Sequence, residues 1–156
     1  LRAFGFQFLA ADPGLTDAVA AEMGVSKCSP ETLLQTADII SLHAPATDLT
    51  TEYFNAARLA TMQPHAMLVN SARGQLINEA DLAAALTKGI IAAAALDVFH
   101  VEPLPADSPL RHAPNLTLTP HAAWYSEAAI HRLQELVALD ITRALSGKGP
   151  RKPVPQ

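Results

Sequence analysis

The sequence predicts an α/β fold in which a parallel sheet is covered by helices on both faces. Three observations predict it. Short apolar runs of strand length alternate with segments whose apolar residues recur at helical spacing. The apolar runs are continuous, which is typical of parallel strands that are buried on both sides. Ser, Thr or Asn precedes most of the helical segments, as a capping residue does.

The first third of the chain is expected to contain two strands and two helices. Asp12-Pro13-Gly14 ends the first apolar run as a turn. Thr16 and Ser29 have hydroxyl side chains that can cap a helix, and Pro30 suits a first helical position. The predicted elements are a strand at Phe6–Ala11, a helix at Asp17–Met23 ended by Gly24, a helix that begins at Pro30, and a strand at Asp38–His43.

The rest of the chain continues the alternation. Asn55 and Asn78 are each expected to cap a helix, and Gly89 is expected to end the second of these. Ser126 opens a long helix with an apolar stripe. The predicted elements are a helix at Ala56–Met62, a strand at Ala66–Asn70, a helix at Glu79–Lys88, a strand at Ile90–Leu96, a proline-rich loop at Pro103–Pro114, a strand at Leu116–Thr119 and a helix from Ser126 to about Leu145.

Composition excludes several classes of function. The net charge of −4 leaves no basic surface for nucleic acid. No apolar stretch reaches the ~18 residues that span a membrane. The single cysteine, Cys28, excludes an internal disulfide and suits a reducing compartment, so we expect a cytoplasmic protein. We expect no metal site.

Three polar residues follow three separate apolar runs: Arg73, Glu102 and His121. In open α/β sheets such groups converge, because ligands bind at the carboxyl ends of the strands. Taken singly, each has a plainer interpretation: an arginine in a surface ion pair, a solvated glutamate, a histidine satisfied in the core. Together they are the groups needed to reduce a 2-keto acid or oxidise a 2-hydroxy acid. Arg73 would hold the substrate carboxylate, His121 would transfer a proton, and Glu102 would favour the charged imidazole.

Asp12 is the candidate for the cofactor end of the site. An acidic residue after an early strand can accept hydrogen bonds from the ribose of an adenosine, and it favours NAD over NADP. The alternative is that Asp12-Pro13-Gly14 is only a turn.

The motifs V-N-S-A-R-G (69–74), A-A-L-D-V-F (94–99) with Glu-Pro shortly after it, and T-P-H-A-A-W (119–124) resemble those of the D-isomer-specific 2-hydroxyacid dehydrogenases, in their coenzyme domain. The run P-H-A-A-W-Y-S-E (120–127) is most similar to the C-terminal-binding protein branch. The resemblance implies a Rossmann-like doubly wound sheet, NAD as cofactor, and catalytic roles for Arg73, Glu102 and His121. By the same resemblance the cofactor would contact His43, Ala44, Pro45, Thr50, Ser71, Ala72, Arg73, Asp97 and His121. Trp124 would form a wall of the substrate pocket, or else is a core aromatic that opens a helix.

The glycine-rich phosphate loop of this fold, G-x-G-x-x-G, does not occur in the sequence, whose only G-x-G pair is Gly147/Gly149. We therefore expect an N-terminally truncated coenzyme domain at 1–146, a disordered tail at 147–156, and no substrate domain. The missing first strand is central in the order 3-2-1-4-5-6, so a gap is expected between the first two strands and the others. We expect the isolated chain to bind NAD weakly or not at all and to be inactive.

Two classes of function remain open. The first is an oxidoreductase that, as part of the intact protein, transfers a hydride between NAD(H) and a small 2-keto or 2-hydroxy acid. The alternative is an NAD(H)-responsive co-regulator of the C-terminal-binding protein type, or an inactive truncated product. Glyoxylate, hydroxypyruvate, phosphoglycerate and branched keto acids all stay open as substrates. The resemblance also implies a homodimer.

Overall fold

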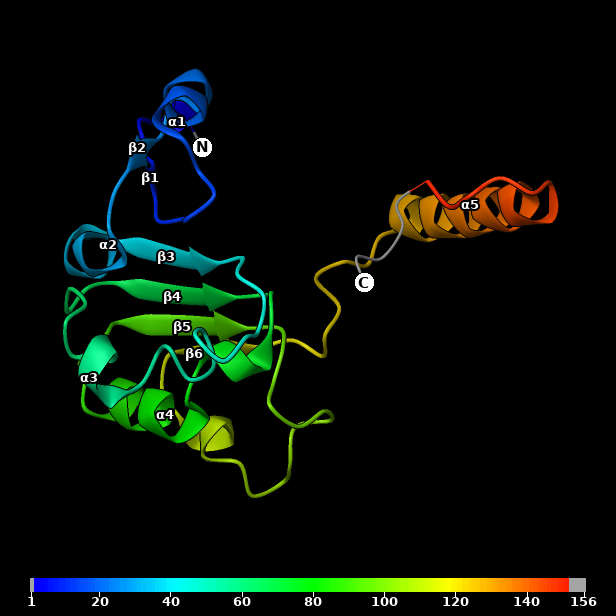
Figure 1. The fold of residues 1–156 in the computed structure, drawn as a ribbon. Helices are drawn as coiled ribbons and strands as arrows, with labels where there is room; N and C mark the ends of the chain where they lie inside the picture. The colour runs from blue at the N-terminus through cyan, green and yellow to red at the C-terminus, as the bar shows by residue number, and fades with distance from the viewer. Residues whose placement is uncertain (1, 152–156) are drawn as a thin grey trace. The chain divides into compact units, whose positions relative to one another are not determined.

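The computed structural model describes residues 2–151, which divide into two compact units, one ending at His121 and the other beginning at Ala122 (Figure 1). The elements of the first unit are η1 (Arg2–Phe4), β1 (Leu9–Ala10), α1 (Asp17–Met23), β2 (Ser26–Lys27), α2 (Pro30–Thr36), β3 (Ile39–Leu42), α3 (Ala56–Leu59), β4 (Met67–Asn70), η2 (Gly74–Leu76), α4 (Glu79–Thr87), β5 (Ala93–Leu96), η3 (Pro109–His112) and β6 (Leu116–Leu118). The second unit contains α5 (Glu127–Leu145). The domain end expected at residue 146 and the disordered tail stay predictions, since 152–156 lie outside the described residues.

The strands form two separate parallel sheets, so the predicted α/β class is confirmed. One sheet pairs β1 with β2, and the other has the order β3-β4-β5-β6. Among residues 2–151 no ladder of backbone hydrogen bonds joins the two sheets. A gap was predicted after the second expected strand, Asp38–His43, but the observed gap lies before it, because β3 pairs with β4 in the larger sheet. The pairing of β2 with β1 was not predicted, because two residues are too short to show a strand period.

The four strands of the larger sheet end in register. Their last residues form one row across the sheet, namely Leu42, Asn70, Leu96 and Leu118. The residues that follow them therefore leave the sheet along one edge, and these are His43, Ser71, Asp97 and Thr119. Because the sheet is parallel, this edge collects the segments that carry every predicted catalytic residue.

The core lies on one face of the larger sheet. The strands alternate there, and alternate residues such as Leu68 and Leu96 are buried with side chains of α3, α4 and η3. Figure 1 shows α3 and α4 together on that side of the sheet. On the other face Ile39 is 46% exposed and Met67 is 42% exposed. Within the first unit, α3 and α4 therefore cover one face of the larger sheet, and burial of its other face stays a prediction.

The predicted helix starts are confirmed by side-chain caps. Thr16 accepts a hydrogen bond from the Val19 N–H, and Ser29, Asn55, Asn78 and Ser126 cap the four later α-helices in the same way. The prediction of a strand from residue 90 was wrong, because β5 begins at Ala93. The Gly89 N–H bonds the Leu86 carbonyl and the Ile90 N–H bonds the Ala85 carbonyl. These two bonds close the end of α4, so they use Ile90 as part of the helix cap.

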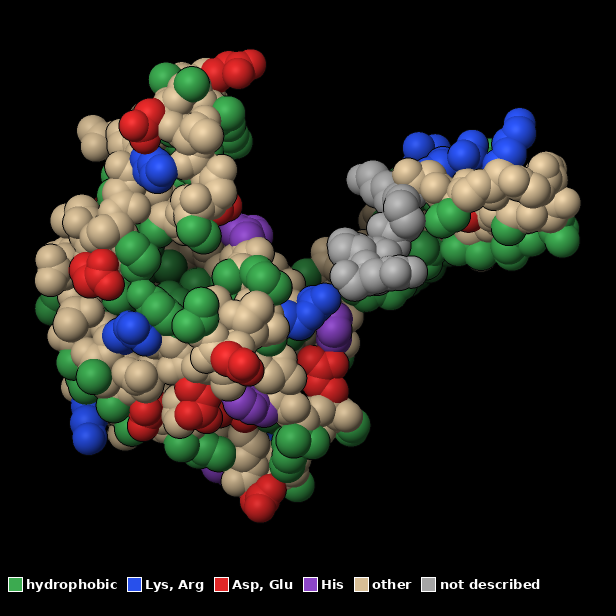
Figure 2. Space-filling view, in the orientation of Figure 1, with side chains coloured by type: hydrophobic (Ala, Val, Ile, Leu, Met, Phe, Trp, Pro, Cys, Tyr) green, Lys and Arg blue, Asp and Glu red, His purple; other side chains and the backbone are tan. Residues whose placement is uncertain are grey.

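The second unit is dominated by α5, a helix of 19 residues in which no residue is buried. Its apolar stripe includes Leu133, Val137 and Ile141, all of them exposed. Figure 2 shows hydrophobic side chains along one side of α5 and Lys and Arg side chains along the opposite side. Near its C-terminal end, the Arg151 guanidinium binds both carboxylate oxygens of Asp140, at 2.8 and 3.0 Å. These contacts reach into the region expected to be a tail.

Within residues 2–151, none of the helices has both the length and the apolar character that a membrane crossing requires. In the same range, His, Cys, Asp and Glu side chains form no group of three or more that could hold a metal ion.

Candidate active site

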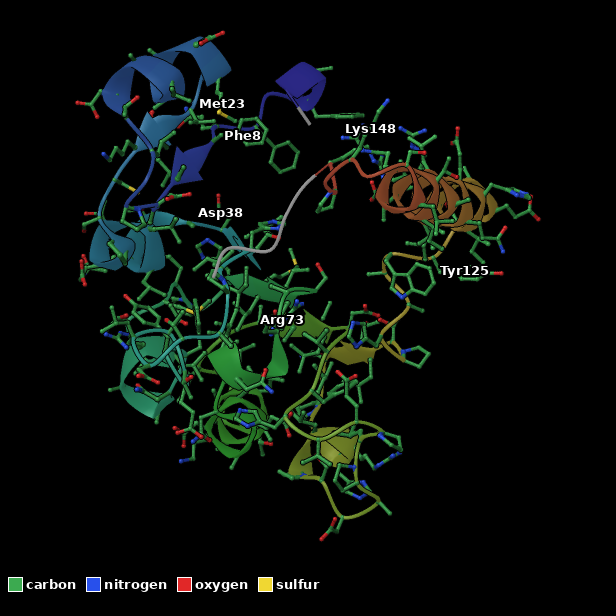
Figure 3. The ribbon with its side chains drawn as sticks, turned by 45° about the vertical axis from the view of Figure 1, so that its right-hand side comes forward. Phe8, Met23, Asp38, Arg73, Tyr125 and Lys148 are labelled. Atoms are coloured by element: carbon green, nitrogen blue, oxygen red, sulfur yellow. The ribbon has the colours of Figure 1, made fainter. Side chains whose placement is uncertain are left out.

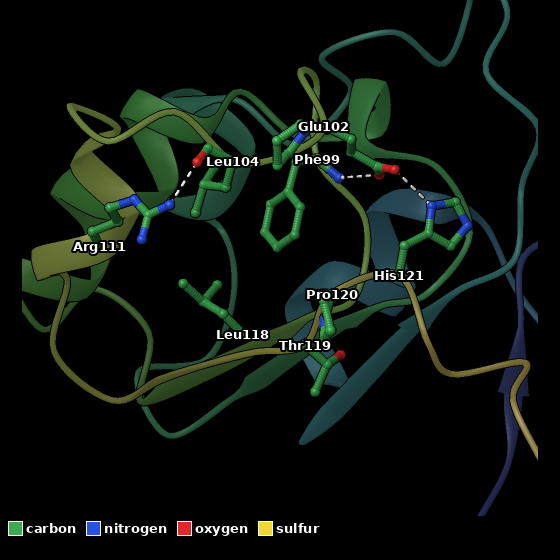
Figure 4. Close-up of a pocket in the computed structure, with 9 residues that line it drawn as sticks. Phe99, Glu102, Leu104, Arg111, Leu118, Thr119, Pro120 and His121 are labelled. Atoms are coloured by element: carbon green, nitrogen blue, oxygen red, sulfur yellow. Dashed lines mark hydrogen bonds and ion pairs between the residues drawn. The ribbon is translucent and has the colours of Figure 1, made fainter.

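The predicted acid and histidine lie in direct contact. The Nδ1 atom of His121 is 2.7 Å from Oε2 of Glu102, although the two residues are 19 positions apart (Figure 4). The second carboxylate oxygen, Oε1, accepts a hydrogen bond of 3.0 Å from the Phe99 N–H. The loop after β5 and the loop after β6 are therefore joined through this carboxylate.

The Glu102 carboxyl is held in its ionised form. The hydrogen bond from His121, followed by the one from the Phe99 N–H, lowers the pKa of Glu102 below its ordinary value. An ionised carboxylate only accepts hydrogen bonds, so Nδ1 of His121 carries the proton of this contact. The other ring nitrogen, Nε2, then lies on the side of the imidazole away from Glu102, where it can form a hydrogen bond with a substrate oxygen.

His121 also has an unusual backbone. Its φ is +54°, in the left-handed region that residues with a Cβ rarely adopt. Such a conformation costs on the order of 1 kcal/mol or more and is concentrated at functional sites. The residue with this backbone is the one whose imidazole contacts Glu102.

Arg73 lies in the turn that leaves β4, as Figure 3 shows. Its side chain is exposed, and its guanidinium donates to the Ala72 carbonyl at 2.6 Å. A pocket of about 390 Å³ is lined by Arg73, Glu102 and His121, together with Gly74, Gln75, Val98, Phe99 and His100. The structure thus brings the three predicted catalytic side chains to one pocket.

A second pocket, of about 590 Å³, shares Phe99, Glu102 and His121 with the first. Its other walls are mostly apolar and come from Pro103, Leu104, Leu118 and Pro120, with Thr119 and Arg111 also at its edge (Figure 4). The Arg111 guanidinium is bound to the carbonyls of Leu104 and Pro105. The histidine–glutamate pair therefore stands between a polar pocket and an apolar one.

Gly74 sets how closely two of these loops approach each other. A Cβ on Gly74 would overlap the carbonyl group of Phe99 and stand 2.5 Å from the His100 nitrogen. Only glycine fits this contact, which presses the arginine loop against the segment that binds Glu102. Next to it, Glu79 accepts a hydrogen bond from the His100 N–H at 2.8 Å, and the His100 ring bonds the Ile77 carbonyl at 3.0 Å.

Asp12 lies two residues after the end of β1, and its side chain is exposed. Its Oδ1 accepts a hydrogen bond of 2.7 Å from the Gly14 N–H, so the turn interpretation is correct in itself. A carboxylate accepts at two oxygens, so the turn leaves acceptor capacity for a ligand hydroxyl. The ribose contact therefore stays a prediction.

The residues expected to line the cofactor follow β3, β4 and β5. His43 comes directly after β3, and its ring bonds the Ser41 hydroxyl at 2.9 Å. Thr50 ties the loop that contains Ala44 and Pro45, since its hydroxyl donates to the Pro45 carbonyl at 2.7 Å. Ser71 and Ala72 form the turn after β4, with Ser71 exposed and Ala72 half-buried.

Asp97 is buried directly after β5, where its carboxylate accepts a hydrogen bond from the Thr119 hydroxyl. This bond links the ends of β5 and β6 beside the histidine loop. Trp124 belongs to the second unit, where it is exposed and packs edge-on against Tyr125 at 5.8 Å. Its role as a substrate wall stays a prediction.

These residues remain the candidates for contact with part of a dinucleotide. Two carboxylates, Asp12 and Asp97, stand at the carboxyl ends of strands, where the hydroxyl and amide groups of NAD need acceptors. The 156 residues contain no glycine-rich phosphate loop, so no cradle for the pyrophosphate was found among them.

Several residues of the site were missed by sequence reasoning. The bond from the Phe99 N–H to Glu102, the contact of Gly74 with Phe99 and the two amide bonds of Asn70 were not predicted. Asn70 is 1% exposed at the end of β4. A polar residue that ends an apolar strand run was the available signal for it.

Residues 1–123 match the family model described as "D-isomer specific 2-hydroxyacid dehydrogenase, NAD binding domain". The chain is 37% identical over 149 residues to a glyoxylate reductase of Korarchaeum cryptofilum, covering 96% of this chain and 45% of that protein. It is 40% identical over 148 residues to a D-3-phosphoglycerate dehydrogenase of Mycobacterium bovis, covering 95% of this chain and 28% of that protein.

Among solved structures, the fold matches the D-lactate dehydrogenase of Lactobacillus jensenii with NAD+, at a TM-score of 0.88 and 32% identity. The match covers 99% of this chain and 50% of that one. The chain therefore spans half or less of the length of these relatives. The predicted Rossmann-like fold and the predicted cofactor, NAD, are both confirmed by these matches. The chain belongs to the D-isomer specific 2-hydroxyacid dehydrogenases, and residues 1–123 are part of the NAD-binding domain of that family.

Proposed function

We propose that the chain carries the catalytic side chains of an NAD-dependent enzyme that interconverts small 2-keto acids and D-2-hydroxy acids. The observation that supports this most is the contact between His121 Nδ1 and Glu102 Oε2, at 2.7 Å, on the pocket that Arg73 also lines. The names of the relatives, a glyoxylate reductase, a phosphoglycerate dehydrogenase and a lactate dehydrogenase, all describe 2-keto or 2-hydroxy acid chemistry.

Each side chain has a task in this proposal. The planar guanidinium of Arg73 grips the substrate carboxylate with paired hydrogen bonds and places the neighbouring carbonyl next to His121. Nε2 of His121 gives its proton to the carbonyl oxygen in reduction and takes it back in oxidation. Glu102, held ionised, keeps the ring oriented through Nδ1 and stabilises its positive charge. When NAD is bound, the nicotinamide supplies or accepts the hydride.

The test is steady-state reduction of a panel of 2-keto acids by NADH with the complete protein, covering glyoxylate, hydroxypyruvate, pyruvate and branched keto acids, with oxidation of 3-phosphoglycerate assayed alongside. His121→Asn is expected to lower kcat by roughly 10²–10⁴-fold, the contribution of a positioned acid–base group. Arg73→Lys is expected to act mainly on the KM for the keto acid. His112→Asn is the matched control, since His112 is exposed on η3 and lines neither pocket.

The co-regulator alternative makes a different prediction. A protein that binds NADH yet reduces no member of the panel, and whose His121→Asn variant behaves like the wild type, would replace the enzyme proposal with that alternative. We further propose that the complete protein is a homodimer, which sedimentation analysis of the purified protein would test.

A further inference from the structure

Asn70 combines deep burial in an apolar setting with one hydrogen bond at each of its two amide atoms. It is 1% exposed at the last position of β4, and its register partners on either side are Leu42 and Leu96. Burying an amide side chain among aliphatic groups costs several kcal/mol unless it forms hydrogen bonds. Asn70 forms them with the segment that carries Arg73.

The Asn70 amide holds the turn after β4 by two hydrogen bonds. Its Nδ2 donates to the Arg73 carbonyl at 2.9 Å, and its Oδ1 accepts from the Ala72 N–H at 3.0 Å. The backbone carbonyl of the same residue accepts from the Asp97 N–H at 2.9 Å. One residue therefore connects the arginine turn to the strand that leads to Glu102.

Arg73 needs such a support. Its side chain is exposed and has a long flexible stem, so its guanidinium is directed by the backbone from which that stem starts. That backbone is fixed at the Arg73 carbonyl by Asn70 and, one residue later, by the close contact of Gly74 with Phe99. A free arginine side chain has many rotamers, so a fixed backbone reduces the conformational freedom that substrate binding must remove.

We propose that Asn70 is a positioning residue, which acts through Arg73 to hold the guanidinium where the carboxylate of a 2-keto acid binds. The inference rests on the proposed function, because it assigns Arg73 to the substrate. The competing interpretation is that the hydrogen bonds of Asn70 stabilise the fold and do not affect how Arg73 binds substrate.

The deciding variant is Asn70→Asp in the complete protein. It keeps the size of the side chain and an acceptor for the Ala72 N–H, but replaces the donor to the Arg73 carbonyl by an oxygen. We expect the KM for the keto acid to rise roughly tenfold or more, as for a buried hydrogen bond left unmade. The KM for NADH is expected to stay within about twofold. Binding of oxamate, an unreactive analogue of a 2-keto acid, measured calorimetrically in the presence of NADH, should weaken by the same factor.

The same substitution is then made in an Arg73→Ala background. If Asn70 acts through Arg73, the second substitution adds less than about twofold to the loss in either measurement. An equal fold-change in both backgrounds would overturn the inference and leave a stability role. Asn70→Ser, which keeps a shorter hydroxyl donor, replaces the aspartate variant if that protein does not fold. For this variant too we expect a higher KM for the keto acid, weaker oxamate binding, and little further loss in the Arg73→Ala background.

Ser108→Ala is the matched control for loss of a buried polar group. Ser108 is buried, caps η3 through a bond to the Leu110 N–H, and lines neither pocket. The Ser108→Ala substitution should lower the melting temperature without changing the KM for the keto acid. If Arg73→Ala itself leaves the keto-acid KM and oxamate binding unchanged, the proposed function fails and takes the inference with it. If Arg73→Ala weakens both and the Asn70 effect is additive, only the inference fails.

Discussion

Replacing Gly74 by alanine tests how tightly the two catalytic loops are joined. The new Cβ would stand 2.5 Å from the His100 nitrogen and overlap the Phe99 carbonyl, whereas ordinary contact begins at 3.4 Å. The loops would have to separate by about 0.9 Å at His100 and by more at Phe99. Both partners are backbone, so no side chain can rotate to make room. Overpacking of this kind costs roughly 1–3 kcal/mol of stability.

The same separation should reduce activity more than stability. Arg73 precedes the glycine, and the Phe99 N–H holds Glu102, so the shift moves two catalytic groups apart. A displacement of about 1 Å can cost on the order of 10²-fold in rate. We expect kcat/KM of the complete protein to fall by about that factor, with a lower melting temperature. Gly149→Ala is the control, since its Cβ meets nothing within 4 Å. A Gly74→Ala enzyme that retains kcat/KM within about twofold would refute the reasoning.

Three further predictions follow from the site. Because the folded pKa of Glu102 lies below its unfolded value of about 4.3, the stability that its pairing contributes is complete above that value and is lost as the pH falls through the folded pKa. Thermal melts across this range should show a smaller loss for Glu102→Gln, and equal slopes would contradict the pairing. Asp12→Ala in the complete protein should raise the KM for NADH while changing that for NADPH little, and unchanged preference would remove Asp12 from the cofactor site. The isolated 156-residue chain, which has no glycine-rich loop, should not show saturable tight binding of NADH, as calorimetry would establish.

The parts of the fold that the sequence predicted well are those set by local chemistry. Thr16 and Ser29 cap their helices through bonds to residues three positions away, so the signal and the structure lie within one turn. The start of β5 was wrong because Ile90 serves the end of α4, a local effect of Gly89 that competes with the apolar run. The exposure of Ile39 depends on which elements cover the sheet, which no short window of sequence contains.

The catalytic residues of the candidate site could be predicted from the sequence, but the contacts that hold their loops in place could not. Arg73 and His121 follow strands, and parallel strands that end in register bring such residues to one edge. The bond from the Phe99 N–H to Glu102 and the contact of Gly74 with Phe99 depend on how two loops settle against each other. Asn70 resembles any polar residue at the end of a strand until its two amide bonds are seen.

The separation of β1 and β2 from the larger sheet has a consequence for local opening. A two-stranded sheet is at best marginally stable by itself, and these strands have two residues each. The amides that join them, those of Ser26 in β2 and of Cys28 just after it, should exchange with solvent deuterium through openings of lower free energy than the amides of β4 and β5. Asp12 follows β1, so if it binds the adenosine ribose as predicted, that end of the cofactor contacts this easily opened part of the unit. Binding of the cofactor at Asp12 should therefore slow deuterium exchange at the Ser26 and Cys28 amides.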